Sequence, residues 1–436
     1  MYHLNNILQH STIFRSAIKA TIILVAIIAT SACNDSIKRT VTYTVNEPIY
    51  MSFSEFRAEP SMSSEQSIIH PGKICVYGDY IFISELTKGI HVIDNRNPAS
   101  PQSVAFIKLI GNVDIIVKSN LLFADSYIDL VWFDISNPVQ PKMLGRLENV
   151  FTNVLPVTDN EYPVKEVDYN KGVVVGWETK VITEEEQVSN YHPCMNCLDL
   201  GNQEGYSSWS DAGLSSSKVN TMAGSMARFA VHGNNLYVVN NYKLKVFSIS
   251  ENTVLTGTEQ QILWNVETIF AYNRNLFLGT SNGLIIYDLY NPNEPSYLSS
   301  LSHVVGCDPV VVQNDYAYVT IRGGNLCGQN FNLLDVIDIS NPAQPSLKAS
   351  YTLTSPYGLG IDGNTLFVCD AGLKIFDATD PATIDSHLLK QFSNIEGFDV
   401  IPYNNILILI GNDGLYQYDY SNLQDIKQLS VIKVTQ

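Results

Sequence analysis

The stretch LDVIDISNPAQP, residues 334–345, runs from an apolar strand into a polar turn and decides the fold of this chain. Its β-branched and apolar residues suit a strand, and its two prolines lack the N–H group that would continue a strand ladder. The same order recurs six more times, and the residue after each apolar run is Asp94, Asp134, Ser248, Asp288, Asp338, Asp377 or Asp419. The steps between these positions are 40, 114, 40, 50, 39 and 42 residues. A period near 40 in a strand-rich pattern indicates a radial or stacked repeat architecture.

One repeat, residues 73–109, contains four strand-like segments. KICVY and YIFIS flank Gly78-Asp79, which permits a tight turn, and IHVID and SVAFIKL flank the turn NRNPASP. In that turn Asp94 and Asn97 can accept hydrogen bonds from nearby backbone N–H groups. Four antiparallel strands per repeat match one propeller blade. The same order recurs at 113–149, 227–263, 266–302, 307–353, 356–392 and 397–434, with no sustained helical period, so we expect few helices.

The long step between Asp134 and Ser248 leaves room for a further repeat and an insertion. Residues 164–184 contain a strand, an Asn-Lys-Gly turn and a valine-rich strand, with Glu184 where aspartate usually stands. We interpret this segment as a degenerate blade and predict an all-β fold, a single β-propeller of eight four-stranded antiparallel blades over residues 65–436. The alternative is seven blades with a hairpin-bearing insertion.

LDVIDISNPAQP and LVWFDISNPVQP resemble the repeat of the LVIVD-repeat family of bacterial and archaeal cell-surface proteins. The resemblance extends over residues 73–434. It implies a β-propeller lipoprotein at the cell envelope. It implies no activity, because that family is defined by its repeat and carries no catalytic motif. Ser248 and the absence of proline in the third and seventh copies depart from the family pattern.

The N-terminus predicts export. Arg15 and Lys19 precede a short apolar run, and Thr30-Ser31-Ala32 then lead into Cys33. This end resembles a bacterial lipobox, although Thr30 departs from the usual leucine, and the resemblance implies a signal peptide at 1–32 and a lipid on Cys33. Ordinary cleavage to a secreted product is the alternative. A lipid would anchor the chain to the membrane without a membrane-spanning segment.

Residues 33–64 would form a leader between the anchor and the propeller. Within it VTYTV and IYMSF alternate like strands, and one of them could close the ring by pairing with the last blade. We expect the protein at the outer membrane, on its periplasmic side or at the cell surface.

The charge excludes one class of partner. Removal of residues 1–32 leaves 24 Lys and Arg against 43 Asp and Glu, a net charge of −19. Nucleic-acid binding depends on neutralising phosphates with basic residues, so we exclude it. The dispersed acids favour solubility, and we expect a monomer.

The cysteines other than Cys33 divide into three groups. Cys307 and Cys327 lie on the same side of one repeat and are candidates for a disulfide, whereas Cys75 and Cys369 occupy apolar strand positions that predict buried free thiols. The third group is Cys194 and Cys197. With His192 nearby, that pair could form a local disulfide, half of a metal site or a redox pair. We expect a disulfide and no metal or cofactor.

A ring of polar residues is the candidate ligand site. The position five residues before each first turn holds Lys73, Asp114, Arg228 and Asp399 in four of the copies. At the mouth of the central channel these side chains could bind a small anionic or sugar ligand, or they could simply pair with one another. We expect Asp114 and Asp399 on either side of Lys73, and Arg228 elsewhere on the ring.

The irregular insertion, at about 187–223, is a candidate for recognition because functional residues often lie on loops. Its Tyr191, Tyr206 and Trp209 could contact a protein or glycan, or only pack the loop. No catalytic fingerprint is present in a supporting context. We therefore predict a non-catalytic exported lipoprotein that presents a propeller face to a protein or glycan. The alternative is an enzyme acting on an extracellular glycan or related metabolite at the channel mouth.

Overall fold

A computed structural model describes residues 37–152, 154–158, 161–188, 221–223, 228–251, 253–302, 309–323 and 331–435. The chain divides into two compact units. The smaller unit comprises Met1–Glu47, Tyr162–Lys165 and Thr179–Gln203, and the larger comprises Pro48–Glu161, Glu166–Glu178 and Glu204–Gln436. Helices are short where the chain is described: α2 spans Phe53–Phe56 and the 3-10 helix η1 spans Ile384–Ser386. None of the helices in these ranges has the length and apolar character that a membrane crossing requires.

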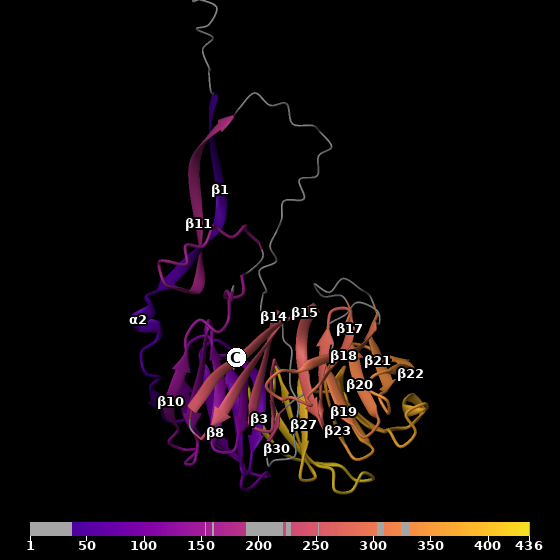
Figure 1. Cartoon of the computed structure of the whole chain (residues 1–436). Coiled ribbons are helices and arrows are strands. Elements are labelled where there is room, and N and C mark those ends of the chain that lie inside the picture. The colour runs from indigo at the N-terminus through magenta and orange to yellow at the C-terminus, as the bar shows by residue number, and fades with distance from the viewer. Residues whose placement is uncertain are drawn as a thin grey trace, which may run out of the picture. The chain divides into compact units, whose positions relative to one another are not determined.

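The larger unit is a β-propeller, as predicted, and its antiparallel sheets follow one another around a ring (Figure 1). The first sheet contains β3 (Pro71–Tyr77), β4 (Tyr80–Glu85), β5 (Gly89–Asp94) and β6 (Gln102–Lys108), with β12 (Thr221–Ala223) beside β3 and β2 (Met62–Ser63) beside β6. The second contains β7 (Ile115–Lys118), β8 (Leu121–Ser126), β9 (Asp129–Asp134) and β10 (Lys142–Leu147). The third contains β13 (Phe229–His232), β14 (Asn235–Ser250), β15 (Thr253–Tyr272), β16 (Asn275–Thr280), β17 (Gly283–Asp288) and β18 (Ser296–Ser302).

The last three sheets are regular four-stranded blades. They contain β19 (Val310–Gln313), β20 (Tyr316–Ile321), β21 (Leu333–Asp338) and β22 (Ser346–Thr352); β23 (Pro356–Asp362), β24 (Thr365–Asp370), β25 (Leu373–Asp377) and β26 (Leu388–Phe392); and β27 (Gly397–Tyr403), β28 (Ile406–Gly411), β29 (Gly414–Asp419) and β30 (Lys427–Lys433).

Seven sequence copies form six blades, so the expected number of eight, and the alternative of seven, are both wrong. Each copy begins with a tight hairpin that contains at least one residue with a positive φ: Gly78, Ser119, Gly233, Asn273, Asn314, Gly363, or Asn404 with Asn405. Glycine and asparagine tolerate this backbone conformation best. The third and fourth copies share one sheet, because β15 runs without a break from the end of one into the start of the next.

Residues 164–184 do not form a blade. Only the second half of this segment lies in a strand, β11 (Val173–Val188). β11 pairs with β1 (Ile37–Met51) in a separate two-stranded sheet. Within the smaller unit, the Thr42 and Thr183 hydroxyls lie 3.0 Å apart and the Tyr43 hydroxyl donates to Glu184 at 3.0 Å. The eighth blade is therefore absent, and the leader strand pairs with β11 rather than with the last blade.

The ring closes through side chains and the C-terminal tail. Ile74, Ile81 and Ile83 of the first blade share a buried cluster with Ile401, Ile408 and Ile410 of the last. The Ser430 hydroxyl donates to the carbonyl of Pro98 at 2.6 Å, and the Thr435 N–H donates to the Ile68 carbonyl at 2.8 Å. Burial of apolar surface between the first and last blades thus replaces a swapped strand as the closure.

The repeated turn has a clear chemical basis. In six copies the aspartate that ends the third strand accepts a hydrogen bond from the N–H two residues on, as Asp338 does from Ser340 at 3.0 Å. In five copies a second such bond follows, as from the Ala343 N–H to Asn341 at 3.2 Å. The predicted backbone bonds to Asp94 and Asn97 are confirmed. Side chains that satisfy nearby N–H groups stabilise a turn that has no ladder partner.

These turns predict a loss of stability in acid. Hydrogen bonds from the side chain and backbone of the residue two places on lower the pKa of Asp338, Asp377 and Asp419. A lowered pKa means that the stability is present above the unfolded value, about 4, and is lost as the pH falls through the folded value. We expect the urea midpoint to fall on acidification below about pH 4. Asp338→Asn, which keeps an acceptor oxygen, should lose less stability at pH 7 than Asp338→Ala, which should lose about 1 kcal/mol. Equal losses would contradict this account.

Candidate functional site

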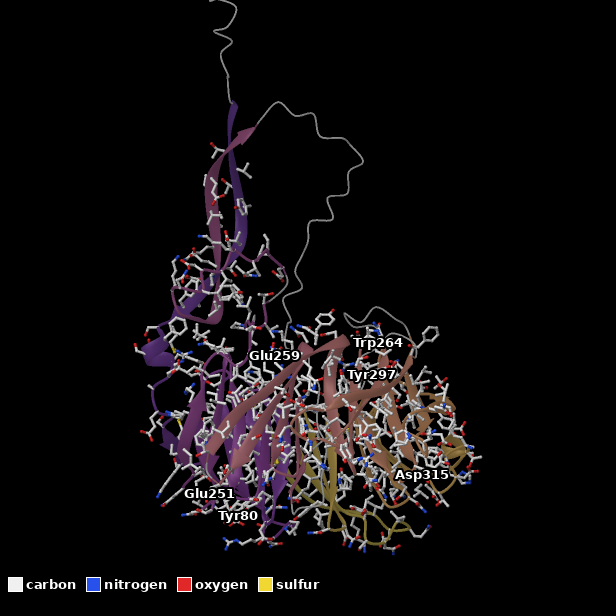
Figure 2. The ribbon with its side chains drawn as sticks, viewed as in Figure 1. Tyr80, Glu251, Glu259, Trp264, Tyr297 and Asp315 are labelled. Carbon is white, nitrogen blue, oxygen red and sulfur yellow. The ribbon has the colours of Figure 1, made fainter. Side chains whose placement is uncertain are left out.

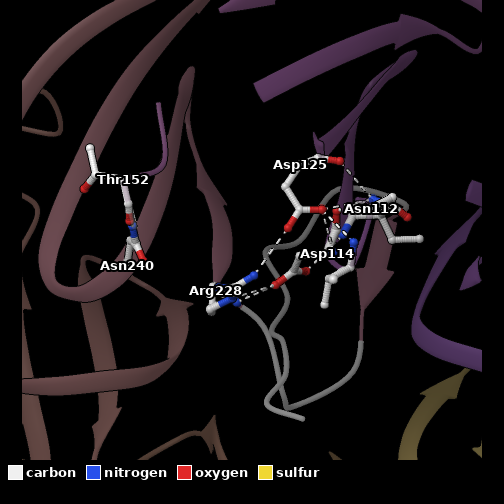
Figure 3. Close-up of polar contacts among 8 residues, drawn as sticks. Asn112, Asp114, Asp125, Thr152, Arg228 and Asn240 are labelled. Carbon is white, nitrogen blue, oxygen red and sulfur yellow. Dashed lines mark hydrogen bonds and ion pairs between the residues drawn. The ribbon is translucent and has the colours of Figure 1, made fainter. Parts of the chain in front are cut away.

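The structure brings Arg228 and Asp114 into direct contact. The Arg228 N–H donates to Asp114 Oδ2 at 2.8 Å, and Arg228 Nε lies 3.8 Å from the same oxygen (Figure 3). We expected Arg228 elsewhere on the ring, and that expectation is wrong. Because residues 164–184 form no blade, the third copy lies next to the second, and the start of β13 meets the start of β7.

A third charged residue, Asp125, completes this buried network. Its Oδ2 lies 3.3 Å from Arg228 Nη2, and its Oδ1 accepts from the N–H groups of Val113 and Asp114 at 2.7 and 2.9 Å (Figure 3). The Asn112 side chain donates to the same Oδ1 at 3.1 Å. Asp114 and Asp125 have no exposed surface, whereas 17% of the Arg228 side chain is exposed. One guanidinium therefore neutralises two buried carboxylates, which also accept backbone hydrogen bonds.

Burial dominates the ionisation of this network. It raises the pKa of Asp125 to about 7, against the opposing charge of Arg228, and it also raises the pKa of Asp114. The same burial lowers the pKa of Arg228. Each charged form is disfavoured by removal from water more than it is favoured by its partners.

The other two candidate residues are placed differently. Lys73, in β3, is buried and its charge lowers the pKa of Asp114, so it belongs to the same electrostatic environment. Asp399, in β27, is buried, accepts from the Val400 N–H at 2.9 Å and raises the pKa of Cys369 by its charge. The four residues therefore divide into a group around Asp114 and a carboxylate that acts on the neighbouring blade.

Sequence reasoning missed Asp125, although a signal for it was present. The end of the second strand also carries an acid in two other copies, and each caps the start of its own blade. Glu85 accepts from the N–H groups of Ile69 and His70, and Asp370 accepts from those of Thr354 and Ser355. Alignment on the second strand would have shown this recurring position. Because the acid at this position caps the start of the blade in three copies, Asp125 has a structural role.

A second buried network, also missed, holds the leader to the second blade. Arg57, just after α2, donates to Asp129 at 2.9 and 3.1 Å, and Arg146 contacts the same carboxylate at 3.1 Å. Phe56 is buried beneath Arg146, whose guanidinium lies 5.6 Å from the ring centroid. A bidentate ion pair and a buried aromatic ring therefore hold the turn after α2 against the second blade.

The cysteine predictions are only partly tested. Cys75 and Cys369 are buried free thiols, as predicted, and burial raises the pKa of both, that of Cys75 to about 12. Cys33, Cys194, Cys197, Cys307 and Cys327 lie outside the described residues. Among the residues that are described, no group of three or more His, Cys, Asp or Glu side chains could hold a metal ion.

The end of the insertion has a defined place. Thr221–Ala223 form β12, which pairs antiparallel with β3, with Thr221 opposite Tyr77 and Ala223 opposite Cys75. β12 also contacts β7 and β27, the first strands of the second and last copies. We expected an irregular segment up to about residue 223, but its last three residues add a strand to the first blade. Tyr191, Tyr206 and Trp209 lie outside the described residues.

A family model identifies the repeat. It is described as the LVIVD repeat, and it matches residues 71–106, 113–148 and 307–353. The chain carries LVIVD repeats. These matches correspond to the first, second and fifth copies, so LVIVD repeats lie in three different blades of the ring. The search of curated proteins found no match to this sequence.

Solved structures with a similar fold support the propeller and nothing finer. A protein from Lactobacillus plantarum has a TM-score of 0.52 at 12% identity, over 84% of this chain and 98% of its own. A putative 6-phosphogluconolactonase from Bacteroides uniformis has a TM-score of 0.52 at 10% identity, over 84% and 98%. The periplasmic gluconolactonase of Pseudomonas aeruginosa has a TM-score of 0.52 at 11% identity, over 83% and 96%. At these identities the likeness shows a common fold, which does not by itself imply a common function.

Proposed function

We propose that this protein is a non-catalytic binding scaffold that presents its propeller surface to a protein or glycan partner. The observation that supports this most is the engagement of the candidate charges with one another. Asp114 and Asp125 share Arg228 and accept backbone N–H groups, so the network resembles a structural ion pair more than a set of groups awaiting a substrate.

The surface offers side chains suited to such contacts. Several large side chains are more than half exposed, among them Tyr242 at 54%, Leu263 at 66%, Tyr290 at 83% and Tyr297 at 55%. Tyrosine combines a large apolar ring with a polar hydroxyl, and it is enriched where proteins bind other molecules.

The alternative is an enzyme acting on an extracellular glycan or related metabolite, with its site around Lys73, Asp114, Arg228 and Asp399. Two of the solved structures with a similar fold are named as a gluconolactonase or a putative phosphogluconolactonase. We therefore include sugar lactones among the substrates to be tested.

The experiment measures binding and turnover on the same protein, the chain from residue 34 onward. Binding of this protein is measured on a glycan array and on immobilised envelope proteins. Turnover is measured separately with sugar lactones and glycosidase substrates. We expect saturable binding and no turnover above the buffer rate. Lactone or glycoside hydrolysis that Arg228→Lys abolishes, in a variant whose circular dichroism is unchanged, would contradict the scaffold and support the enzyme.

We also propose that the chain is exported, lipidated at Cys33 and held as a monomer at the outer membrane, on its periplasmic side or at the cell surface. Cys33→Ala should prevent lipid attachment and shift the protein from the membrane fraction to the soluble fraction by about tenfold or more, because one modified residue supplies the anchor. Metabolic labelling with a radioactive fatty acid, with Cys75→Ala as the control, checks this. Unchanged labelling in Cys33→Ala would contradict it.

A further inference from the structure

The outer strands of the blades differ in how their free edges are protected. An unpaired strand edge can pair with another chain, and lysine on the edge discourages this. β10 carries Lys142 and Arg146, β22 carries Lys348, β26 carries Lys390, and β30 carries Lys427 and Lys433. β18, with the sequence SYLSSLS, carries no charged residue and ends its sheet. Among the described fourth strands of the six blades, β18 is the one without a charged residue.

The chain itself shows that such an edge can accept a strand. β2 pairs antiparallel with the outer edge of β6, with Met62 opposite Ile107 and Ser63 opposite Phe106. Residues Phe106 and Ile107 are opposite His91 and Ile90 of the third strand in their own blade. Ser300 and Leu301 of β18 are opposite Ile285 and Leu284. These two partners follow Gly283 in β17 by two residues and one residue, just as His91 and Ile90 follow Gly89 in β5. Within the described part of the chain, no strand covers the place on β18 that corresponds to the one β2 covers on β6.

The register limits where a strand can be added. In β18 the pairing shifts between Ile286 and Tyr287, which marks a β-bulge near Leu298, and β6 has the same shift between Val92 and Ile93. A bulge disrupts the ladder locally. β2 pairs beyond the bulge of β6, so the equivalent regular stretch on β18 is Ser299–Ser302.

An exposed aromatic side chain lies beside this stretch. Tyr297, at the start of β18, is labelled in Figure 2 and is 55% exposed. Its ring packs edge-on against that of Tyr287. Its hydroxyl lies 3.0 Å from the hydroxyl of Ser300, so the ring extends along the strand over the start of the Ser299–Ser302 stretch. The Ser299 hydroxyl donates to the Pro342 carbonyl at 2.6 Å, which ties the strand to the next blade. A rigid strand with an aromatic ring beside its edge suits peptide recognition by strand addition.

We propose that the outer edge of β18, at Ser299–Ser302, is a strand-addition site for an extended, uncharged segment of a partner protein. The segment has an apolar residue next to a small hydroxyl residue, as Met62-Ser63 has on β6. This inference rests on the proposed role as a binding scaffold and assigns one surface to it.

The test uses an acetylated, amidated peptide, PSMSS, which corresponds to residues 60–64. We titrate it into the chain from residue 34 onward and follow hydrogen exchange by mass spectrometry. We expect saturable protection of residues 296–302, about threefold or more, with a Kd on the order of 1 mM. Residues 346–352 of β22 should not change. The peptide PSPSS should give no protection, because proline cannot donate to the ladder.

Two variants locate the contact. Tyr297→Ala should weaken binding about threefold to tenfold, through loss of the aromatic contact. Leu347→Ala is the matched control, because Leu347 is 53% exposed and occupies the equivalent place on β22. Absence of protection at 5 mM peptide, equal protection by PSPSS, or equal weakening by both variants would overturn the proposal. Each of these results leaves binding at other surfaces intact, so it would not by itself contradict the scaffold function.

Discussion

Replacement of Arg228 with alanine should lower the free energy of unfolding by about 3 to 5 kcal/mol, because it leaves two buried carboxylates without their cation. Asp114 and Asp125 have no exposed surface, and Arg228 is the guanidinium that contacts both. Urea unfolding at pH 8, followed by tryptophan fluorescence, measures the loss. Arg274→Ala is the control, because Arg274 pairs with Asp288 at 3.0 Å but is 65% exposed, and it should lose less than about 1 kcal/mol.

The loss should depend on pH in a defined direction. The pKa of Asp125 is raised to about 7 in the folded state, so the fold holds its proton more tightly than the unfolded chain does. A raised carboxyl pKa makes a stability contribution that is full below the unfolded value, about 4, and is lost as the pH rises through about 7. Because the charge of Arg228 lowers this pKa, Arg228→Ala should raise it further, and the variant should therefore regain more stability than the original protein between pH 8 and pH 5.5. A loss that is the same at both pH values, or no larger than that of Arg274→Ala, would contradict the assigned network.

Replacement of Gly372 with alanine should cost about 3 to 5 kcal/mol, from backbone strain and steric overlap together. Gly372 immediately precedes β25, the third strand of its blade, with a φ of +112°, and a Cβ there would lie 2.0 Å from the carbonyl oxygen of Phe392. That oxygen belongs to the outer strand, so the blade cannot relax without separating its third and fourth strands.

Gly363 provides the matched control for this prediction. It lies in the first hairpin of the same blade with a φ of +57°, and a Cβ there would meet no atom within 4 Å. Gly363→Ala should cost only about 1 kcal/mol, the cost of the left-handed conformation alone. Thermal unfolding of the two variants side by side separates strain from overlap. Similar melting temperatures would show that the third and fourth strands can move apart at little cost.

Most of the fold could be predicted from short stretches of sequence. Turn chemistry acts over a few residues, so Asp94 and Asn97 predicted their own hydrogen bonds, and Gly78-Asp79 predicted a tight hairpin. The apolar surroundings of Cys75 and Cys369 in their strands likewise predicted burial. Seven repetitions of such local signals were enough to predict a propeller.

The candidate site could be predicted only in part, because its neighbours come from distant parts of the chain. The sequence placed Lys73, Asp114, Arg228 and Asp399 at equivalent positions of their repeats. Which of these residues lie in contact depends on the order of the blades in the ring. The observed order differs from the expected one because residues 164–184 form no blade. Arg228 then met Asp114, 114 positions earlier in the chain, and shared Asp125 with it.

The sequence by itself determined the all-β class, the repeated turns and the propeller architecture, because each follows from backbone preferences within a few residues. Only the tertiary structure decided the number of six blades, the pairing of β1 with β11, the strand that β12 adds to β3 and the partners of Arg228. These features depend on which distant edges and charges meet when the ring closes. A strand edge pairs with whatever extended segment reaches it, and a buried charge pairs with whatever opposite charge lies near, so neither outcome can be read from local sequence.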